Sequence, residues 1–406
     1  MTVLADTAVA ARFPVLAERE DVVYLDSAAT SQTPRPVLDA MDDYYARHRA
    51  TVHRSVYPLA AEATELFEGA RERTAAWLNG DARGTIFTKN ATEAINLVAY
   101  SWGRANVGPG DRVVVTELEH HSNFVPWFVL CKEVGATLEV VPVDDEATLD
   151  LDALDRVLAA GGAKVVAVGH VSNAAGTINP VADIVRRAHA AGAIAVIDGS
   201  QAVPQLPVDL AEIDADFYAW TGHKAYGPTG IGILHGRCEL LDAMPPFIGG
   251  GHMIASVALD EVRWAEPPGK FEAGTSAVAE GIGLGAAVDF LRELGMASVR
   301  AHEHDITAYA LERLVEIPGL QIMGPRDADR RGALVAFTLD IAHPHDIAEI
   351  LGSRGVCIRA GHHCAQPLMK RFGVGATSRA SFAVHSTRAD VDALVDGVHE
   401  VRRIFA

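Results

Sequence analysis

The stretch AIAVIDGSQAVPQLPVDLAEIDADFYAWTGHKAYGPTG, residues 193–230, decides the fold of this chain. It opens with an apolar run, Ala193 to Ile197, which is typical of a buried parallel strand and ends at Asp198. A second apolar run, Phe217 to Trp220, leads to Lys224 and a turn rich in glycine and proline. An acid therefore follows one expected strand and a lysine follows another, at the sheet edge where open α/β sheets bind ligands.

These residue types suit pyridoxal phosphate (PLP). Lys224 can form a Schiff base, and Asp198 can keep the pyridine nitrogen protonated so that the ring accepts electrons. Thr221, Gly222 and His223 form a phosphate-sized nest beside the lysine. The alternative is a salt-bridged aspartate and a surface lysine at the ends of ordinary strands.

The composition indicates a cytoplasmic α/β protein. A chain of 406 residues with 49% hydrophobic and 22% charged residues is expected to form two packed domains. Its net charge of −18 argues against nucleic acid or an anionic membrane as partner. We find no membrane-spanning apolar run, no signal-peptide pattern at the N-terminus and no disulfide framework among the four cysteines.

Apolar runs alternate with helical patterns along most of the chain, which predicts a mostly parallel sheet covered by helices on both faces. We expect an N-terminal arm over residues 1–25 that packs with the small domain, and a large domain over 26–290. The small α+β domain, 291–406, follows. The glycine-rich segment 245–276 is interpreted as loops.

Two further turns carry polar groups. Thr92 opens a helix after the expected strand 85–88, where free backbone N–H groups and its hydroxyl could hold an anion. Taken alone, Thr92 with Glu93 is better interpreted as a simple helix cap. The small residues of Asp26-Ser-Ala-Ala-Thr30 indicate either a close approach to a ligand or a tight turn.

Histidines follow two other expected strands. His120 and His121 come after the strand ending at Thr116, and His170 precedes Asn173 after the strand ending at Gly169. No third ligand stands at a helical spacing, so an imidazole stacked on a planar cofactor is favoured over metal, and no metal site is expected.

Cys364 ends the segment Arg359-Ala-Gly-His-His-Cys, which is expected to be a loop of the small domain. A thiol flanked by histidines and an arginine is in a setting that favours the thiolate, the nucleophilic form. The alternative is an incidental loop cysteine. Cys131 and Cys357 lie in apolar patterns and are expected in the core.

The order of these motifs resembles a known family. The chain contains KNATEAINLV, ELEHHSNFVPW, HVSNAAGTINP, DGSQAVPQLPVDL, TGHKAYGPTGIGIL, FEAGT, RAGHHCAQPLM and RASFAVHST. It resembles fold-type I PLP-dependent transferases of the class V aminotransferase group, and within them the group II cysteine desulfurases of the SUF iron–sulfur system. The compact RAGHHCAQP distinguishes it from group I relatives, which have a longer loop there. The fold implied is an α/β large domain with a mostly parallel seven-stranded sheet plus a small α+β domain.

The resemblance implies an enzyme that converts L-cysteine to L-alanine and keeps the sulfur as a persulfide. Lys224 would bind PLP and move protons, and Cys364 would accept the sulfur. His120 would stack on the ring. The other implied cofactor residues are Asp198, Gln201, Thr92, Thr221, His223 and, from a partner subunit, Thr275. The implied substrate-binding and entrance residues are Asn173, Arg379, Arg359 and Arg54.

The resemblance also implies a homodimer and a sulfur-acceptor protein of the SUF system, with His345 as a docking residue or a solvated histidine at a helix start. Tyr57 and His385 replace a histidine and a tyrosine of many relatives and are expected at the pocket edge. The alternatives are a selenocysteine lyase, which would act on L-selenocysteine, a class V aminotransferase, and a non-catalytic assembly scaffold.

Overall fold

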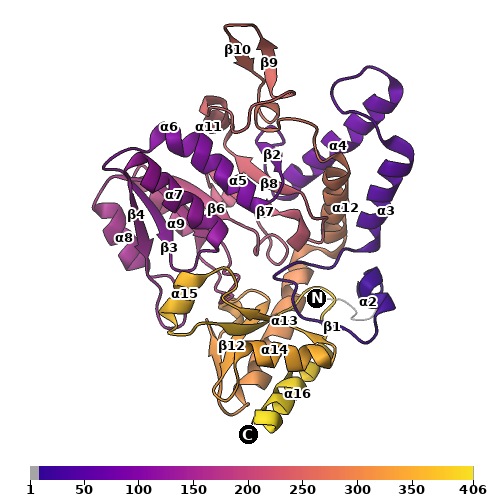
Figure 1. Cartoon of the computed structure of the whole chain (residues 1–406), viewed down its shortest axis with the longest axis vertical. Coiled ribbons are helices and arrows are strands. Elements are labelled where there is room, and N and C mark those ends of the chain that lie inside the picture. The colour runs from indigo at the N-terminus through magenta and orange to yellow at the C-terminus, as the bar shows by residue number, and fades with distance from the viewer. Residues whose placement is uncertain (1–8, 406) are drawn as a thin grey trace.

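The computed structural model describes residues 9–405. The two strands expected within residues 193–230 lie in the middle of a seven-stranded sheet (Figure 1). The strand order is β2-β8-β7-β6-β5-β3-β4, and β8 runs antiparallel to both of its neighbours while the others are mutually parallel. The predicted mostly parallel sheet is therefore confirmed. Its strands are β2 (Thr85–Thr88), β3 (Arg112–Thr116), β4 (Thr137–Val141), β5 (Ala163–Gly169), β6 (Ile194–Asp198), β7 (Phe217–Thr221) and β8 (Gly232–Gly236).

Helices cover both faces of this sheet because alternate side chains of each strand point to opposite sides. On β3, Val113 and Val115 join the core of α5, α7 and α11, whereas Val114 joins the core of α4, α8, α9 and α12. The helices are α3 (Arg35–Asp43), α4 (Pro58–Trp77), α5 (Ala91–Leu97), α6 (Arg104–Asn106), α7 (Val125–Val134), α8 (Leu151–Ala159), α9 (Val181–Ala190), α10 (Leu210–Ile213), α11 (Cys238–Ala243) and α12 (Val278–Leu294). The π-helices η1 (Tyr44–His48) and η2 (Val98–Gly103) extend α3 and α5, and η3 (His121–Asn123), η4 (Gly222–Lys224) and η5 (Gly269–Phe271) are 3₁₀ turns.

A second sheet with its own core lies at the other end of the molecule (Figure 1). It is antiparallel, in the order β11-β12-β15-β14. The C-terminal part of the chain contains, in order, α13 (Met296–Val315), β11 (Leu320–Met323), η6 (Ala328–Arg330), β12 (Leu334–Leu339), α14 (Pro344–Ser353), β13 (Val356–Cys357), β14 (Arg359–Gly361), α15 (Gln366–Arg371), β15 (Thr377–Ser381) and α16 (Arg388–Phe405). Leu368 and Met369 of α15 pack in the core of the large sheet. The division at residue 290 falls inside α12 and stays a prediction.

The N-terminal arm contains α2 (Pro14–Glu18) and β1 (Val23–Tyr24), and β1 pairs in parallel with β13. The part of the predicted arm before residue 9 lies outside the described residues.

Two sequence expectations need correction. Segment 245–276 is not loop throughout, because β9 (Ile254–Val257) and β10 (Val262–Trp264) form a hairpin at the end of the molecule furthest from α16 (Figure 1). Its side chains are largely exposed, so it has no buried face to produce an alternating pattern. The segment from Arg359 to Gly361 is the edge strand β14, too short to show a periodicity.

Close backbone approaches shape the sheet edge where the site lies. A Cβ on Gly199, directly after Asp198, would lie 2.1 Å from the Tyr218 ring. A Cβ on Gly232 would lie 2.4 Å from the backbone of Asn90. Glycine at these two positions therefore lets the end of β6 pack against β7 and lets the start of α5 approach β8.

Candidate active site

A cavity of about 190 Å³ lies at the carboxyl ends of the parallel strands. The large domain supplies most of its wall, and Arg359, His363 and Arg379 come from the C-terminal sheet and the loop after β14. The predicted site residues that line it are Thr92, His120, Asn173, Asp198, Thr221, His223, Lys224, Arg359 and Arg379. The structure therefore brings nine sequence-predicted residues to one place. Ala28 and Ala29 also line it, so the small residues of that turn approach the cavity.

Lys224 lies in the 3₁₀ turn η4 directly after β7, and burial lowers its pKa to about 8 although Asp198 opposes the shift. A lysine with such a pKa is partly unprotonated near neutrality and can act as a nucleophile. Asp198 is 8% exposed, and its Oδ1 accepts a hydrogen bond from the Ser200 N–H at 3.0 Å. Its carboxylate thus faces the cavity as a nearly buried anion that suits a protonated ring nitrogen.

His120 precedes the turn η3 and is held by Ser122, whose backbone N–H donates to His120 Nδ1 at 3.1 Å. Burial, with Lys224 adding to it, lowers the pKa of His120 to about 4, so its imidazole is neutral at physiological pH. A neutral ring on the cavity wall can pack on a planar cofactor without charge repulsion from Lys224.

Glu119, the residue before His120, is almost fully buried between two hydrogen-bond donors. The Thr116 hydroxyl and the Asn123 amide each donate to its carboxyl group at 2.6 Å. Burial raises the pKa of Glu119 to about 8. The turn that carries His120 is therefore fixed by a buried hydrogen-bonded carboxyl group.

Hydroxyl groups gather at the end of the cavity near α5. The helix is capped by Asn90, whose side chain accepts from the Glu93 N–H at 2.9 Å. Thr92 is therefore not the cap, whereas Glu93 does accept from the Lys89 N–H at 3.1 Å. Thr92 is free to pair with the Ser122 hydroxyl at 2.6 Å. The Thr221 hydroxyl is buried without any hydrogen-bond partner in the described structure.

An unpartnered buried hydroxyl lining a cavity is uncommon and indicates a missing polar partner. Thr221 lies beside His223, whose Nδ1 is 3.2 Å from the Thr30 hydroxyl. Together with Thr92 these groups form a donor set suited to a phosphate. Lys224 and Asp198 line the same cavity, so the residues present fit PLP.

Arg379 is a buried arginine, 1% exposed, beside the cavity. Its Nη2 pairs with Asp26 Oδ1 at 3.0 Å and its Nη1 donates to the Asn173 carbonyl at 2.8 Å, while Nε has no partner in the described structure. Burial lowers the pKa of Arg379 and raises that of Asp26. The guanidinium is thus held in place with donor capacity left for a carboxylate.

Cys364 follows the lining residue His363 and lies close enough to Lys224 and Arg379 to influence the pKa of each. The thiol is half-buried. His363 and Cys364 both have left-handed backbone, with φ of +50° and +56°. The Asn173 amide donates to the His363 carbonyl at 2.6 Å, so Asn173 holds this loop as well as lining the cavity.

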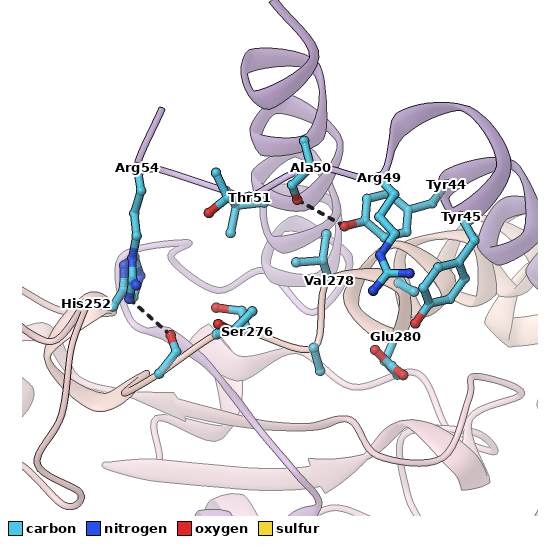
Figure 2. A pocket seen from close by; sticks show the side chains of 15 residues that line it. Tyr44, Tyr45, Arg49, Ala50, Thr51, Arg54, His252, Ser276, Val278 and Glu280 are labelled. Carbon is cyan, nitrogen blue, oxygen red and sulfur yellow. Dashed lines mark hydrogen bonds between the residues drawn. The ribbon is translucent and has the colours of Figure 1, made fainter. Parts of the chain in front are cut away.

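Four predicted residues lie elsewhere. Gln201 lines a small space continuous with the cavity through Asp198 and Lys224, and donates to the Ala28 carbonyl at 2.7 Å. Thr275 and Arg54 instead line a separate hollow of about 510 Å³, in which Arg54 donates to the Gly274 carbonyl at 3.4 Å (Figure 2). His345 is exposed at the start of α14.

Two departures from the family pattern do not line either of these cavities. His385 is 5% exposed and packs edge-on against Phe13, 5.2 Å between ring centroids, so its expected place at the pocket edge is wrong. Tyr57 is half-exposed before α4 and lies outside the described lining residues.

The sequence reasoning missed Asp26 and Ser122, which hold Arg379 and the His120 turn. Both stand inside motifs it quoted, but nothing local distinguishes them from ordinary turn residues.

Within residues 9–405, no helix is long and apolar enough to cross a membrane. The same described residues contain no group of three or more His, Cys, Asp and Glu side chains that could hold a metal ion.

Comparisons agree with the chemistry of this cavity. Residues 23–394 match the Aminotransferase class-V family, so the chain belongs to that family and its cofactor is PLP. A probable cysteine desulfurase of Streptomyces coelicolor is 50% identical, covering 99% of this chain and 98% of the relative.

Solved structures of cysteine desulfurases also resemble this chain. The apo cysteine desulfurase of Thermococcus onnurineus is 38% identical with a TM-score of 0.95, covering 99% of this chain and all of that one. A cysteine desulfurase of Escherichia coli in an S-sulfonic acid form is 36% identical with a TM-score of 0.92, and both chains are fully covered. Within the class V family, the chain is one of the cysteine desulfurases.

Proposed function

We propose that this chain converts L-cysteine to L-alanine and captures the released sulfur as a persulfide on Cys364. The observation that carries the proposal is the position of Cys364, next to a lining residue of the cavity that holds Lys224 and Asp198. A half-buried thiol on a loop at the cavity wall can reach both the bound substrate and an external acceptor.

Bound PLP supplies an electron sink that stabilises the carbanion formed at the substrate carbon. Asp198 would keep the ring nitrogen protonated, and His120 would pack on the ring. Thr92, Thr221 and His223 would hold the phosphate, and Gln201 would bond the phenolic oxygen. Arg379, Asn173 and Arg359 orient the substrate carboxylate, with Arg379 already fixed by Asp26.

Lys224 and Cys364 then do the chemistry. Lys224 Nζ removes the α-proton, which its lowered pKa permits near neutrality. The Cys364 sulfur attacks the substrate sulfur, so an S–S bond forms as the C–S bond breaks and its electron pair stays on Cβ. Lys224 returns protons at Cβ and at Cα, one of them the α-proton and the other the proton lost by the Cys364 thiol. This yields alanine and a Cys364 persulfide with no external oxidant or reductant.

We further propose a homodimer in which Thr275 completes the phosphate site of the partner. The supporting observation is that Thr275 and Arg54 line a hollow apart from their own cavity (Figure 2). A mixture of Lys224→Ala and Thr275→Ala chains tests this, because it should form dimers with one intact site. Equal activity of the mixture and the two separate variants contradicts it.

The sulfur acceptor is proposed to be a SUF-type protein that docks near Cys364, and His345 is proposed to be part of the docking surface. We propose that this transfer takes place in the cytoplasm. The four cysteines are free thiols, which suits a reducing compartment. A His345→Ala variant should form the persulfide normally but transfer it more slowly to a purified acceptor.

Mass spectrometry after incubation with L-cysteine tests the central proposal. We expect one extra sulfur atom on the Cys364 peptide and an equal amount of alanine. Transfer of the amino group to a keto acid would indicate an aminotransferase. A preference for L-selenocysteine that survives Cys364→Ala would indicate a selenocysteine lyase, and a protein that ignores added PLP would indicate a scaffold.

A further inference from the structure

The loop that carries Cys364 has an unusual backbone. His363 and Cys364 are consecutive non-glycine residues in the left-handed region, with φ of +50° and +56°. Such backbone costs free energy at each residue and persists only where surrounding contacts hold it. Gly361 precedes them at φ +132°, so the chain from Gly361 to Cys364 departs from ordinary backbone at three of its four residues.

His121 contacts this loop from the large domain at two points. Its backbone N–H donates to the Cys364 carbonyl at 2.7 Å. Its imidazole Nε2 accepts a hydrogen bond from the Gln366 N–H, the first residue of α15, at 3.3 Å. The two bonds bracket Ala365, so a single residue holds both sides of the turn from Cys364 into the helix.

A second histidine holds the other side of Cys364. The Cys364 N–H donates to His362 Nδ1 at 3.0 Å, and the His362 and His121 rings lie 5.6 Å apart between centroids. The N–H and the carbonyl of the cysteine are therefore both engaged. His121 also follows His120 directly, so the turn that carries the ring-stacking histidine is the one that holds the thiol loop.

We propose that His121 is a positioning residue, whose unprotonated Nε2 fixes the start of α15 and thereby holds Cys364 at the cavity. The proposal rests on the proposed function of Cys364 and extends it to a residue for which the family resemblance gave no role. Burial and the neighbouring His362 lower the pKa of His121, which favours the neutral imidazole. The Gln366 N–H that donates to Nε2 then requires the ring proton to be on Nδ1.

The test compares two substitutions of matched size. Gln in His121→Gln places an oxygen near the Nε2 position and can accept from Gln366, whereas Phe in His121→Phe keeps a ring but has no acceptor. Alkylation of Cys364 by iodoacetamide in the PLP-loaded protein, followed peptide by peptide, measures how firmly the loop is held. Resolution by peptide is needed because Cys238 and Cys357 are also partly exposed.

We expect His121→Phe to speed alkylation of Cys364 and slow single-turnover persulfide formation, each about fivefold, the scale of one lost hydrogen bond. His121→Gln should restore both rates to those of the wild type. His399→Phe, an exposed histidine on α16, is the control for an unrelated imidazole. The PLP absorbance band should be the same in all four proteins, because His120 is retained.

If Phe and Gln variants both match the wild type, or both differ from it equally, an acceptor role for the His121 imidazole is wrong. Neither outcome affects the proposed function, which instead fails if wild-type Cys364 acquires no sulfur from L-cysteine.

Discussion

The two sides of the cavity are built differently. On the side of the central sheet, Asp198 is the nearly buried last residue of β6, and Lys224 lies half-buried in the 3₁₀ turn directly after β7. On the other side, Cys364 is half-buried in a loop with left-handed backbone, held by hydrogen bonds from the large domain.

This difference between the two sides of the cavity fits the two proposed tasks of the site, which are cofactor chemistry and sulfur transfer. Binding a cofactor and tuning proton transfer need a rigid, desolvated wall, since burial is what shifts the pKa of Lys224 and His120. Handing sulfur to another protein needs a thiol that solvent can reach, which a loop between two short elements provides.

The largest expected effect comes from the rigid wall. Lys224→Ala should lower the rate of alanine formation about 10⁴-fold, because it removes the group that binds PLP and moves both protons. The absorbance band of the Schiff base should disappear, whereas the exposed control Lys132→Ala should keep it. A Lys224→Ala protein that retains the band would show that Lys224 is not the residue that forms the Schiff base with PLP.

The second-largest expected effect distinguishes the role of the Cys364 loop from that of the cofactor-binding residues. Cys364→Ala should reduce turnover of L-cysteine at least about a hundredfold while the PLP band stays unchanged, because the nucleophile lies outside the cofactor wall. Cys357→Ala, on β13 of the same domain, is the matched control and should keep normal persulfide formation. Full desulfurase activity in Cys364→Ala would refute the capture of sulfur by this residue.

Arg379 joins the two sides, so its substitution should affect binding and stability together. Arg379→Lys should raise the KM for L-cysteine about tenfold and lower the free energy of unfolding by about 1 kcal/mol, because lysine keeps the charge beside Asp26 but cannot also bond the Asn173 carbonyl as the guanidinium does. Kinetics and urea denaturation measure both. Arg403→Lys, at an exposed ion pair with Glu400, should change neither quantity noticeably.

The smallest expected effect concerns the buried carboxyl of the wall. Burial raises the pKa of Glu119 from its ordinary 4.5 to about 8, so the folded state binds more protons than the unfolded state between these values. Its contribution to stability is complete below about pH 4.5 and is lost as the pH rises through about 8.

Glu119→Gln should remove the loss of stability that ionisation of Glu119 causes as the pH rises. The stability of the variant relative to the wild type should therefore increase by roughly 1–3 kcal/mol from pH 5 to pH 8. Urea denaturation at the two pH values measures it, with the exposed Glu349→Gln as control. A pH-independent difference would mean that Glu119 is already ionised at pH 5.

Most of the central sheet was predictable. The strand expected over 85–88 agrees with the structure residue for residue, and the strands expected to end at Thr116 and Gly169 end there. These segments are buried on one or both faces, so their apolar pattern is strong. The hairpin β9–β10 and the edge strand β14 were missed because they are short and bury little.

The sequence by itself determined the fold class, the cofactor and which residue types meet at the sheet edge, because parallel strands separated by helices must bring their carboxyl ends together. Only the tertiary structure decided that Asp26 pairs with Arg379, that Thr275 stands apart from its own cavity, and that His121 holds the Cys364 loop. These are contacts between segments far apart in the chain. No local pattern encodes them, because they depend on how the two sheets and their loops pack together.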